Sequence, residues 1–186
     1  MIDTEQRPER ATEALFERER HAVGDQSRQA ALARAAARRL VLSGEQRTAF
    51  EHVTGGRDLA VVIGYAGTGK SAMLGVAREA WEGAGYQVRG AALSGIAAQN
   101  LESGSGIASR TIASLEHQWA QGRDLLSERD LLVIDEAGMI GTRQMERVVS
   151  EATRRGAGLV LVGLSLLAPP ARRSRPLTSP AMAAIE

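Results

Sequence analysis

The sequence lacks cysteine altogether, has a single lysine and carries almost as many acidic as basic residues. Without cysteine, the chain forms neither disulfides nor cysteine-based zinc sites. Its three histidines are far apart in the sequence and do not have the spacing of metal ligands. The formal net charge of +1 excludes a strong overall attraction to nucleic acid or membrane, so any contact with DNA must come from a local surface.

The sequence also lacks a long uninterrupted apolar run, and none of its apolar segments is long enough to span a bilayer. Residues 1–20 are charged and do not contain the apolar stretch of a secretory signal. We therefore expect no membrane segment and a cytoplasmic location.

The single lysine, Lys70, lies in the glycine-rich segment GYAGTGKS of residues 64–71, whereas the other 22 basic residues are arginine. The segment fits the phosphate-binding loop pattern, in which a compact ammonium reaches phosphates where a planar guanidinium fits poorly. It follows the apolar run 59–63, which predicts a buried parallel strand, and it precedes a helix-forming segment. The alternative is a glycine-rich turn that binds nothing. We expect ATP to contact Gly64, Ala66, Gly67, Thr68, Gly69, Lys70 and Ser71, with Lys70 also catalytic.

A second motif is the apolar run 131–134, which is followed by the carboxylates Asp135 and Glu136. Ligands bind beyond the carboxyl ends of parallel strands, so this pair should reach the same sheet edge as the phosphate loop. There, Asp135 would hold Mg²⁺ opposite the Ser71 hydroxyl, directly or through water. Glu136 would orient or deprotonate the attacking water, as a catalytic residue. The alternative is an ordinary strand end that begins a helix.

Strands and helices are expected to alternate between residues 43 and 163, which predicts an α/β domain with a parallel sheet flanked by helices. The expected strands are 58–64, 87–93, 130–135 and 158–163. The expected helices are 43–52, 69–82, 96–101, 111–121 and 143–155, with a Gly/Ser-rich loop over 103–109.

The two ends of the chain differ from this central domain. Residues 1–42 are dense in Glu, Arg and Ala, and we interpret them as a solvated, charged helical linker with helices at 12–20 and 27–42. Residues 164–186 contain four of the five prolines and a cluster of arginines, which predicts a disordered tail.

Residues 42–163 resemble the first motor domain of RecD-type superfamily-one helicases, and most closely the helicase portion of TraA-like conjugative relaxases. The resemblance is carried by LSGEQ at 42–46, by the phosphate loop, by GAALSGIAA at 90–98, by SRTIASL at 109–115 and by DEAGM at 135–139. It implies a P-loop NTPase (RecA-like) fold. It also implies that Gln46 reads the adenine of ATP, although Gln46 is also placed to cap the helix that begins after Ser43.

The same resemblance implies that Ser94, Gly95 and Thr111 contact the phosphates of single-stranded DNA, against the alternative of ordinary loop and helix-cap chemistry. Trp119 could stack on a base, but on a helix we favour a core role. The implied function is that of an Mg²⁺-dependent ATPase domain of a helicase/relaxase, which acts on single-stranded DNA in plasmid transfer with other conjugation proteins.

The chain departs from the family after Gly163, where Leu164 replaces the expected Asp and the Gln that follows a few residues on is absent. We therefore expect a truncated domain whose sheet is incomplete at the C-terminus. Two further interpretations stay open: a module that binds nucleotide without turnover, and a gene remnant that does not fold. A P-loop kinase also stays open, whereas a GTPase with an Asn-Lys-x-Asp motif is excluded because there is no second lysine.

Overall fold

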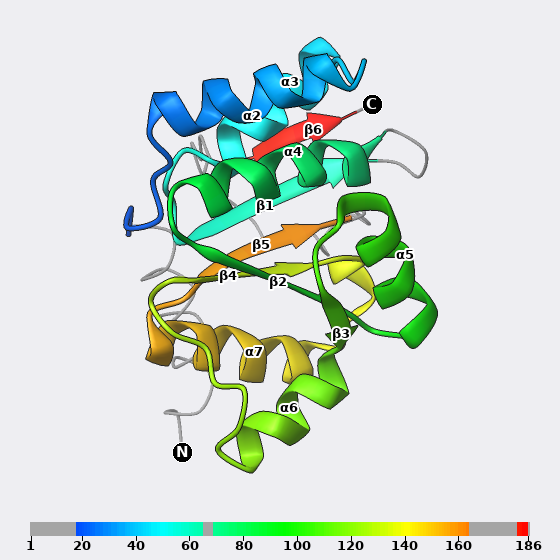
Figure 1. Cartoon of the computed structure of the whole chain (residues 1–186). Coiled ribbons are helices and arrows are strands. Elements are labelled where there is room, and N and C mark those ends of the chain that lie inside the picture. Colours follow the sequence, from blue (N-terminus) through cyan, green and yellow to red (C-terminus); the bar gives the residue numbers. More distant parts are fainter. Residues whose placement is uncertain (1–17, 65–68, 164–181, 186) are drawn as a thin grey trace, which may run out of the picture.

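A computed structural model describes residues 18–64, 69–163 and 182–185, and it has one parallel sheet with helices on both faces (Figure 1). The strand order is β3-β2-β4-β5-β1-β6, and every neighbouring pair is parallel. The predicted α/β fold is therefore confirmed. The strands are β1 (Leu59–Gly64), β2 (Gln87–Ala92), β3 (Ser109–Thr111), β4 (Asp130–Ile134), β5 (Gly158–Val162) and β6 (Met182–Ile185).

The helices lie in two layers. They are α2 (Asp25–Ala37), α3 (Gly44–Val53), α4 (Lys70–Gly83), α5 (Gly95–Ser105), α6 (Ile112–Ala120) and α7 (Thr142–Arg155), with a short 3₁₀ helix η1 (Ala137–Met139). In Figure 1, α2, α3 and α4 cover one face of the sheet, and α6 and α7 cover the other. None of the helices in the described part of the chain is both long enough and apolar enough to cross a bilayer.

Alternate residues of the central strands point to opposite faces, which explains why these strands are continuously apolar in the sequence. In β4, Leu131 and Val133 belong to the core under α2, α3 and α4, whereas Leu132 and Ile134 belong to the core over α6 and α7. β5 divides its residues in the same way. Both faces of these strands are therefore buried, as expected for a parallel sheet between two helical layers.

The helix α2 is part of the domain core and does not form the solvated linker that we predicted. Ala31 and Ala35 are fully buried in the core under α4. Arg34 and Arg38 pair with Glu79 of α4 at 3.0 and 2.5 Å. Although burial opposes it, these two guanidinium groups hold the pKa of Glu79 below its ordinary value. The small side chains of these alanines thus allow α2 to pack closely against α4, which the charged composition of the segment did not indicate. The predicted helix 12–20 lies largely outside the described residues.

Two short elements in the centre of the chain differ from the prediction. The strand β3 was not predicted, because three residues give too short a pattern to recognise. The helix α5 extends to Ser105, through a segment that we expected to be a loop. Its last turn is supported by the Ser105 hydroxyl, which donates to the carbonyl of Leu101 at 2.5 Å.

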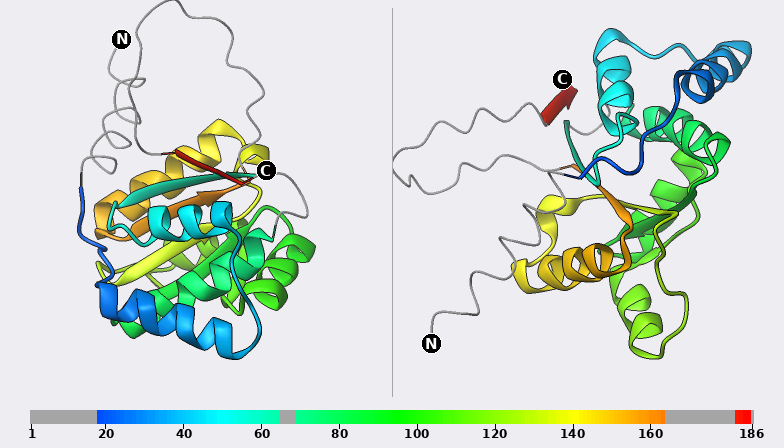
Figure 2. Two further views of the ribbon diagram at one scale, coloured as in Figure 1. Left: turned by 90° about the horizontal axis from the view of Figure 1, so that it is seen from above. Right: turned by 90° about the vertical axis from the view of Figure 1, so that its left-hand side faces the viewer.

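The end of the chain also differs from the prediction. The residues 182–185 form β6, which pairs in parallel with β1, whereas we expected a disordered tail and an incomplete sheet edge. Figure 2 shows β6 beside β1. The residues 164–181 lie outside the described part, so the prediction of disorder is corrected only for 182–185. The division of the chain into linker, motor domain and tail otherwise stays a prediction.

Candidate nucleotide and DNA site

The predicted phosphate loop lies between β1 and α4. Gly64 ends the strand, and Gly69 precedes the helix with φ 73° and ψ 23°, a left-handed conformation that glycine adopts without strain. The Lys70 ammonium donates a hydrogen bond to the carbonyl oxygen of Gly64 at 2.8 Å, so its side chain turns back toward the end of β1. The predicted contacts Ala66, Gly67 and Thr68 lie outside the described residues.

Two opposing effects act on the pKa of Lys70. Burial lowers the pKa of its ammonium from the ordinary value, and the negative charge of Asp135 partly offsets this effect. Asp135 directly follows β4, and its N–H donates to the carbonyl of Ala91 in β2 at 2.9 Å. The strands β1 and β4 both pair with β5 in parallel, so the lysine and the carboxylate lie at the same edge of the sheet. This juxtaposition follows the spatial prediction made from the two motifs.

The acidic pair is held in a tight turn. Glu136 has φ 53° and ψ 35°, which is an unusual, left-handed conformation for a residue other than glycine. Its N–H donates to the Asp135 carboxylate at 2.9 Å. Glu136 is exposed, whereas Asp135 is partly buried. Such left-handed residues are sparsely populated and cluster at functional sites. The turn therefore places two adjacent carboxylates in different environments, and their predicted roles as metal ligand and water-orienting base stay predictions.

Gln46 lies at the phosphate loop and also caps its own helix. Its side-chain oxygen accepts from the Ser43 N–H at 3.0 Å, and its N–H donates to the Ser43 hydroxyl at 3.3 Å, which completes a capping box. A Cβ atom built on Gly69 would lie only 2.2 Å from the Gln46 amide nitrogen. The capping role is confirmed, and the contact with Gly69 places the amide beside the loop. The adenine contact stays a prediction.

The residues present fit a nucleotide bound with a divalent cation. The left-handed Gly69 precedes the N-terminus of the 14-residue helix α4, the Lys70 ammonium bonds to the carbonyl oxygen at the end of β1, and Ser71 lies in the first turn of the same helix. In the described part of the chain, His, Asp and Glu do not form clusters of three or more that could hold a metal. A set of one carboxylate and one hydroxyl suits Mg²⁺, which keeps waters and phosphate oxygens among its ligands.

The predicted DNA contacts lie at the ends of two neighbouring strands. Ser94 caps α5 and accepts from the Ala97 N–H at 3.1 Å, and Thr111 caps α6 and accepts from the Ser114 N–H at 3.2 Å. Ala92 and Thr111 are register partners in the β2–β3 pair. Each hydroxyl is an acceptor in its cap and keeps its own O–H for donation. A Cβ on Gly95 would meet nothing within 4 Å, so the space beside its Cα is open.

The exposed apolar side chains beside Ser94 were not predicted from the sequence, which also left the role of Trp119 open. Leu93 and Ile96 flank the Ser94–Gly95 step and are 44% and 73% exposed, which is high for large apolar side chains. Trp119 packs against the core over α6 and α7, and its indole N–H donates to the carbonyl of Asp124 at 3.2 Å. These contacts favour the core role of Trp119 over stacking on a base.

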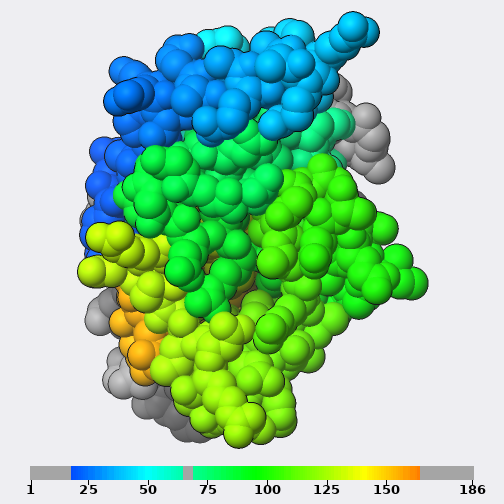
Figure 3. Space-filling model, in the orientation of Figure 1, coloured from blue at the N-terminus to red at the C-terminus, as the bar shows by residue number. Residues whose placement is uncertain are grey.

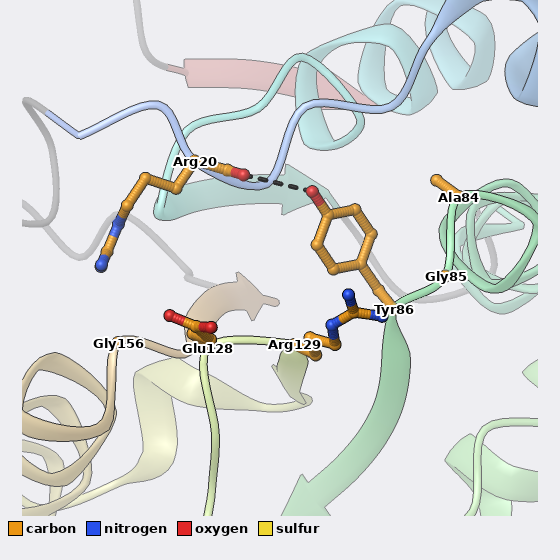
Figure 4. Close-up of a pocket in the computed structure, with 7 residues that line it drawn as sticks. All are labelled: Arg20, Ala84, Gly85, Tyr86, Glu128, Arg129 and Gly156. Atoms are coloured by element: carbon orange, nitrogen blue, oxygen red, sulfur yellow. Dashed lines mark hydrogen bonds between the residues drawn. The ribbon is translucent and has the colours of Figure 1, made fainter.

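A separate pocket of about 260 Å³ lies at the other end of the sheet. Its lining includes Arg20, Tyr86, Glu128 and Arg129, which lie before or near the amino ends of the strands. The Tyr86 hydroxyl donates to the carbonyl of Arg20 at 3.1 Å (Figure 4). Because the phosphate loop and the acidic pair are at the carboxyl ends, this pocket is not part of the candidate nucleotide site.

Fold and loop together define an α/β domain of the P-loop type, and comparison with known proteins identifies its family. Residues 41–165 match the AAA domain family, so the chain belongs to that family. The chain is 56% identical over 122 residues to the "Probable conjugal transfer protein TraA" of Sinorhizobium fredii (strain NBRC 101917 / NGR234), covering 66% of this chain and 11% of that protein. It is 46% identical over 149 residues to the "Conjugal transfer protein TraA" of Agrobacterium fabrum (strain C58 / ATCC 33970), covering 80% of this chain and 13% of that protein.

The chain therefore spans only about a tenth of the length of these relatives. The similarity confirms the predicted likeness to TraA proteins and to a P-loop ATPase domain.

Proposed function

We propose that this chain is a domain that binds and hydrolyses ATP with Mg²⁺, derived from a DNA helicase of conjugative plasmid transfer. The observation that carries the proposal is that β1 and β4, which both pair in parallel with β5, bring Lys70 and Asp135 to one edge of the sheet. The ammonium at the N-terminus of α4 matches a triphosphate, and the carboxylate that follows β4 matches its metal ion.

The proposed roles follow from the position of each residue. The ammonium of Lys70 and the helix N-terminus would attract the phosphates, and the Gln46 amide, which lies beside Gly69, would read the base. Ser71 and Asp135 would hold the Mg²⁺, which neutralises phosphate charge when it is bound. Glu136, exposed beyond Asp135, would orient the attacking water and accept its proton. Ser94, Gly95 and Thr111 would donate hydrogen bonds to the phosphates of single-stranded DNA.

The single lysine allows a direct test of nucleotide binding. An amine-reactive reagent followed by mass spectrometry modifies only Lys70 and the N-terminal amine, which serves as an internal control. MgATP should slow labelling of Lys70 and leave labelling of the N-terminus unchanged. Equal labelling of Lys70 with and without MgATP, confirmed by unchanged ATP affinity of Lys70→Ala in calorimetry, would refute the proposed phosphate site.

Hydrolysis is tested by Glu136→Gln, with ATP turnover measured with and without single-stranded DNA. The variant should bind MgATP as the wild type does, and its turnover should fall by about 10²–10⁴, the contribution of a positioned general base. Tight binding by the wild type with no turnover in either condition would instead assign the chain to nucleotide binding alone.

Contacts with other conjugation proteins belong to the same proposal and follow from the TraA likeness.

A further inference from the structure

The helix α5 contacts the proposed metal ligand at its C-terminal end. A Cβ atom built on Gly104 would lie 2.7 Å from the Cβ of Ser71 and 3.1 Å from its hydroxyl oxygen. The first distance is shorter than real Cβ contacts, and the Cβ of Ser71 is fixed to the backbone, so it cannot rotate away. A side chain at position 104 therefore fits only if α5 or the start of α4 moves.

Helix propensity alone does not account for this glycine. Gly104 lies inside α5 and is exposed, a position at which alanine would favour the helix. The close approach to Ser71 supplies a physical reason for glycine, because the absence of a side chain lets the two helices approach at this level. Figure 3 shows α5 directly beside α4 on this face.

A second set of contacts fixes the same end of α5 on α4. A Cβ on Gly75 would lie 3.2 Å from the carbonyl oxygen of Ser105, so the helices are also close one turn further along α4. Arg78 donates a hydrogen bond from its Nε to that carbonyl at 3.2 Å. This cation at the C-terminus of α5 is favourable for the helix dipole. The C-terminal end of α5 thus contacts α4 at two levels, at Ser71 and again at Gly75 and Arg78.

We infer that Gly104 is a positioning residue for the Ser71 hydroxyl, which rests on the proposed function of Ser71 as a ligand of the nucleotide-bound Mg²⁺. The C-terminal end of α5 packs against Ser71, so the distance between α4 and α5 would determine the position of the Ser71 hydroxyl. A methyl group at position 104 displaces Ser71 or the helix behind it. The affinity for nucleotide should then fall only when the metal is present.

The test is Gly104→Ala, with the affinity for a fluorescent ATP analogue measured in excess Mg²⁺ and in EDTA. We expect about a tenfold loss in Mg²⁺, the lower end of the effect of residues that support metal ligands, and an unchanged affinity in EDTA. Gly75→Ala, whose added methyl would approach the Ser105 carbonyl oxygen at 3.2 Å, should give a smaller loss in Mg²⁺. It also carries the test if Gly104→Ala does not fold.

The matched control is Gly83→Ala, in the last turn of α4, where the added methyl would be 3.8 Å from Ser27. It should bind the analogue as the wild type does in both conditions. If Gly104→Ala melts like the wild type and keeps the full gain in affinity on addition of Mg²⁺, the inference is wrong while the proposed function stands. If the wild type binds no analogue at all, the proposed function and this inference are wrong together.

Discussion

The imidazole of His21 and the carboxylate of Asp58 form a buried pair, with Nδ1 and Oδ1 separated by 2.7 Å and the side chains 2% and 0% exposed. Asp58 immediately precedes β1, and its carboxylate also accepts from the Arg20 guanidinium at 2.7 and 2.9 Å. The other ring nitrogen of His21 lies 3.0 Å from the carbonyl of Glu128. One carboxylate thus holds the N-terminal segment to the strand that carries the phosphate loop.

Replacement of Asp58 by alanine should destabilise the domain strongly. The change leaves His21 buried next to an empty carboxylate position and removes the partner of Arg20. Removing one partner of a buried pair costs about 3–5 kcal/mol of the free energy of unfolding, which urea denaturation followed by circular dichroism would measure. Asp25→Ala is the control, because Asp25 pairs with Arg28 but is 88% exposed. It should cost less than about 1 kcal/mol. Equal stability of the two variants would show that Asp58 does not hold the N-terminal segment to β1.

The contrast between Asp135 and Asp58 shows what could be predicted from the sequence. The motif around Asp135 is local, because an apolar run sets the strand and a carboxylate at its end must reach the ligand edge of a parallel sheet. The partners of Asp58 are 37 and 38 residues earlier, in a segment without periodicity, so no local pattern indicates them. Long-range pairing of single polar residues requires the folded chain.

The same distinction applies to α5 and β6. Gly104 lies in a Gly/Ser-rich stretch that favours a loop, and only the packing against Ser71 explains a glycine inside a helix. Met182–Ile185 has too few residues to predict a strand on its own, and the edge of β1 provides its hydrogen-bonding partner. Tertiary contacts overrode local preference at both positions.

The lowered pKa of Lys70 predicts that nucleotide affinity begins to fall at a lower alkaline pH than it would with an ordinary lysine. Burial disfavours the ammonium, so it loses its proton below the ordinary value of 10.5, although Asp135 partly offsets this. As pH rises through that lowered pKa, the charge that attracts phosphate is lost. Calorimetric titration of MgATP across this alkaline range should show the decline.

The control for this prediction is Lys70→Arg, whose guanidinium stays charged throughout the range. It should bind more weakly but without the same alkaline decline. The same pKa shift affects folding stability in the opposite direction. The unfolded chain binds the Lys70 proton more tightly than the folded chain does, so the contribution of Lys70 to the free energy of unfolding increases as pH rises through this window. Parallel pH profiles of the wild type and Lys70→Arg would contradict the assignment.

Ser94→Asp should weaken binding of single-stranded DNA without loss of stability. Aspartate is as good a helix cap as serine, so α5 keeps its N-terminus. The new charge lies where we propose a DNA phosphate, and like charges set against each other cost several kcal/mol, so a loss of at least about tenfold is expected in fluorescence anisotropy.

The control for Ser94→Asp is Gly24→Asp, which places the same charge at the N-cap of α2, where an added Cβ meets nothing within 4 Å. It should leave DNA affinity unchanged. A similar loss in both variants would indicate a nonspecific effect of charge, and no loss in Ser94→Asp would remove Ser94 from the DNA site.

The strand β6 can be tested by a pair of neighbouring proline variants, Ala183→Pro and Ala184→Pro. These residues are the register partners of Val62 and Ile63 in β1. β6 lies at the edge of the sheet, so the N–H groups of successive residues point alternately toward β1 and away from it. Proline removes a hydrogen bond at only one of the two positions, and at the other it is tolerated as in other edge strands.

We therefore expect one variant to lose about 1 kcal/mol or more of the free energy of unfolding and the other to match the wild type, as measured by urea denaturation. Two variants as stable as the wild type would mean that β6 contributes nothing to the sheet, whereas equal losses would argue against a strand at the edge.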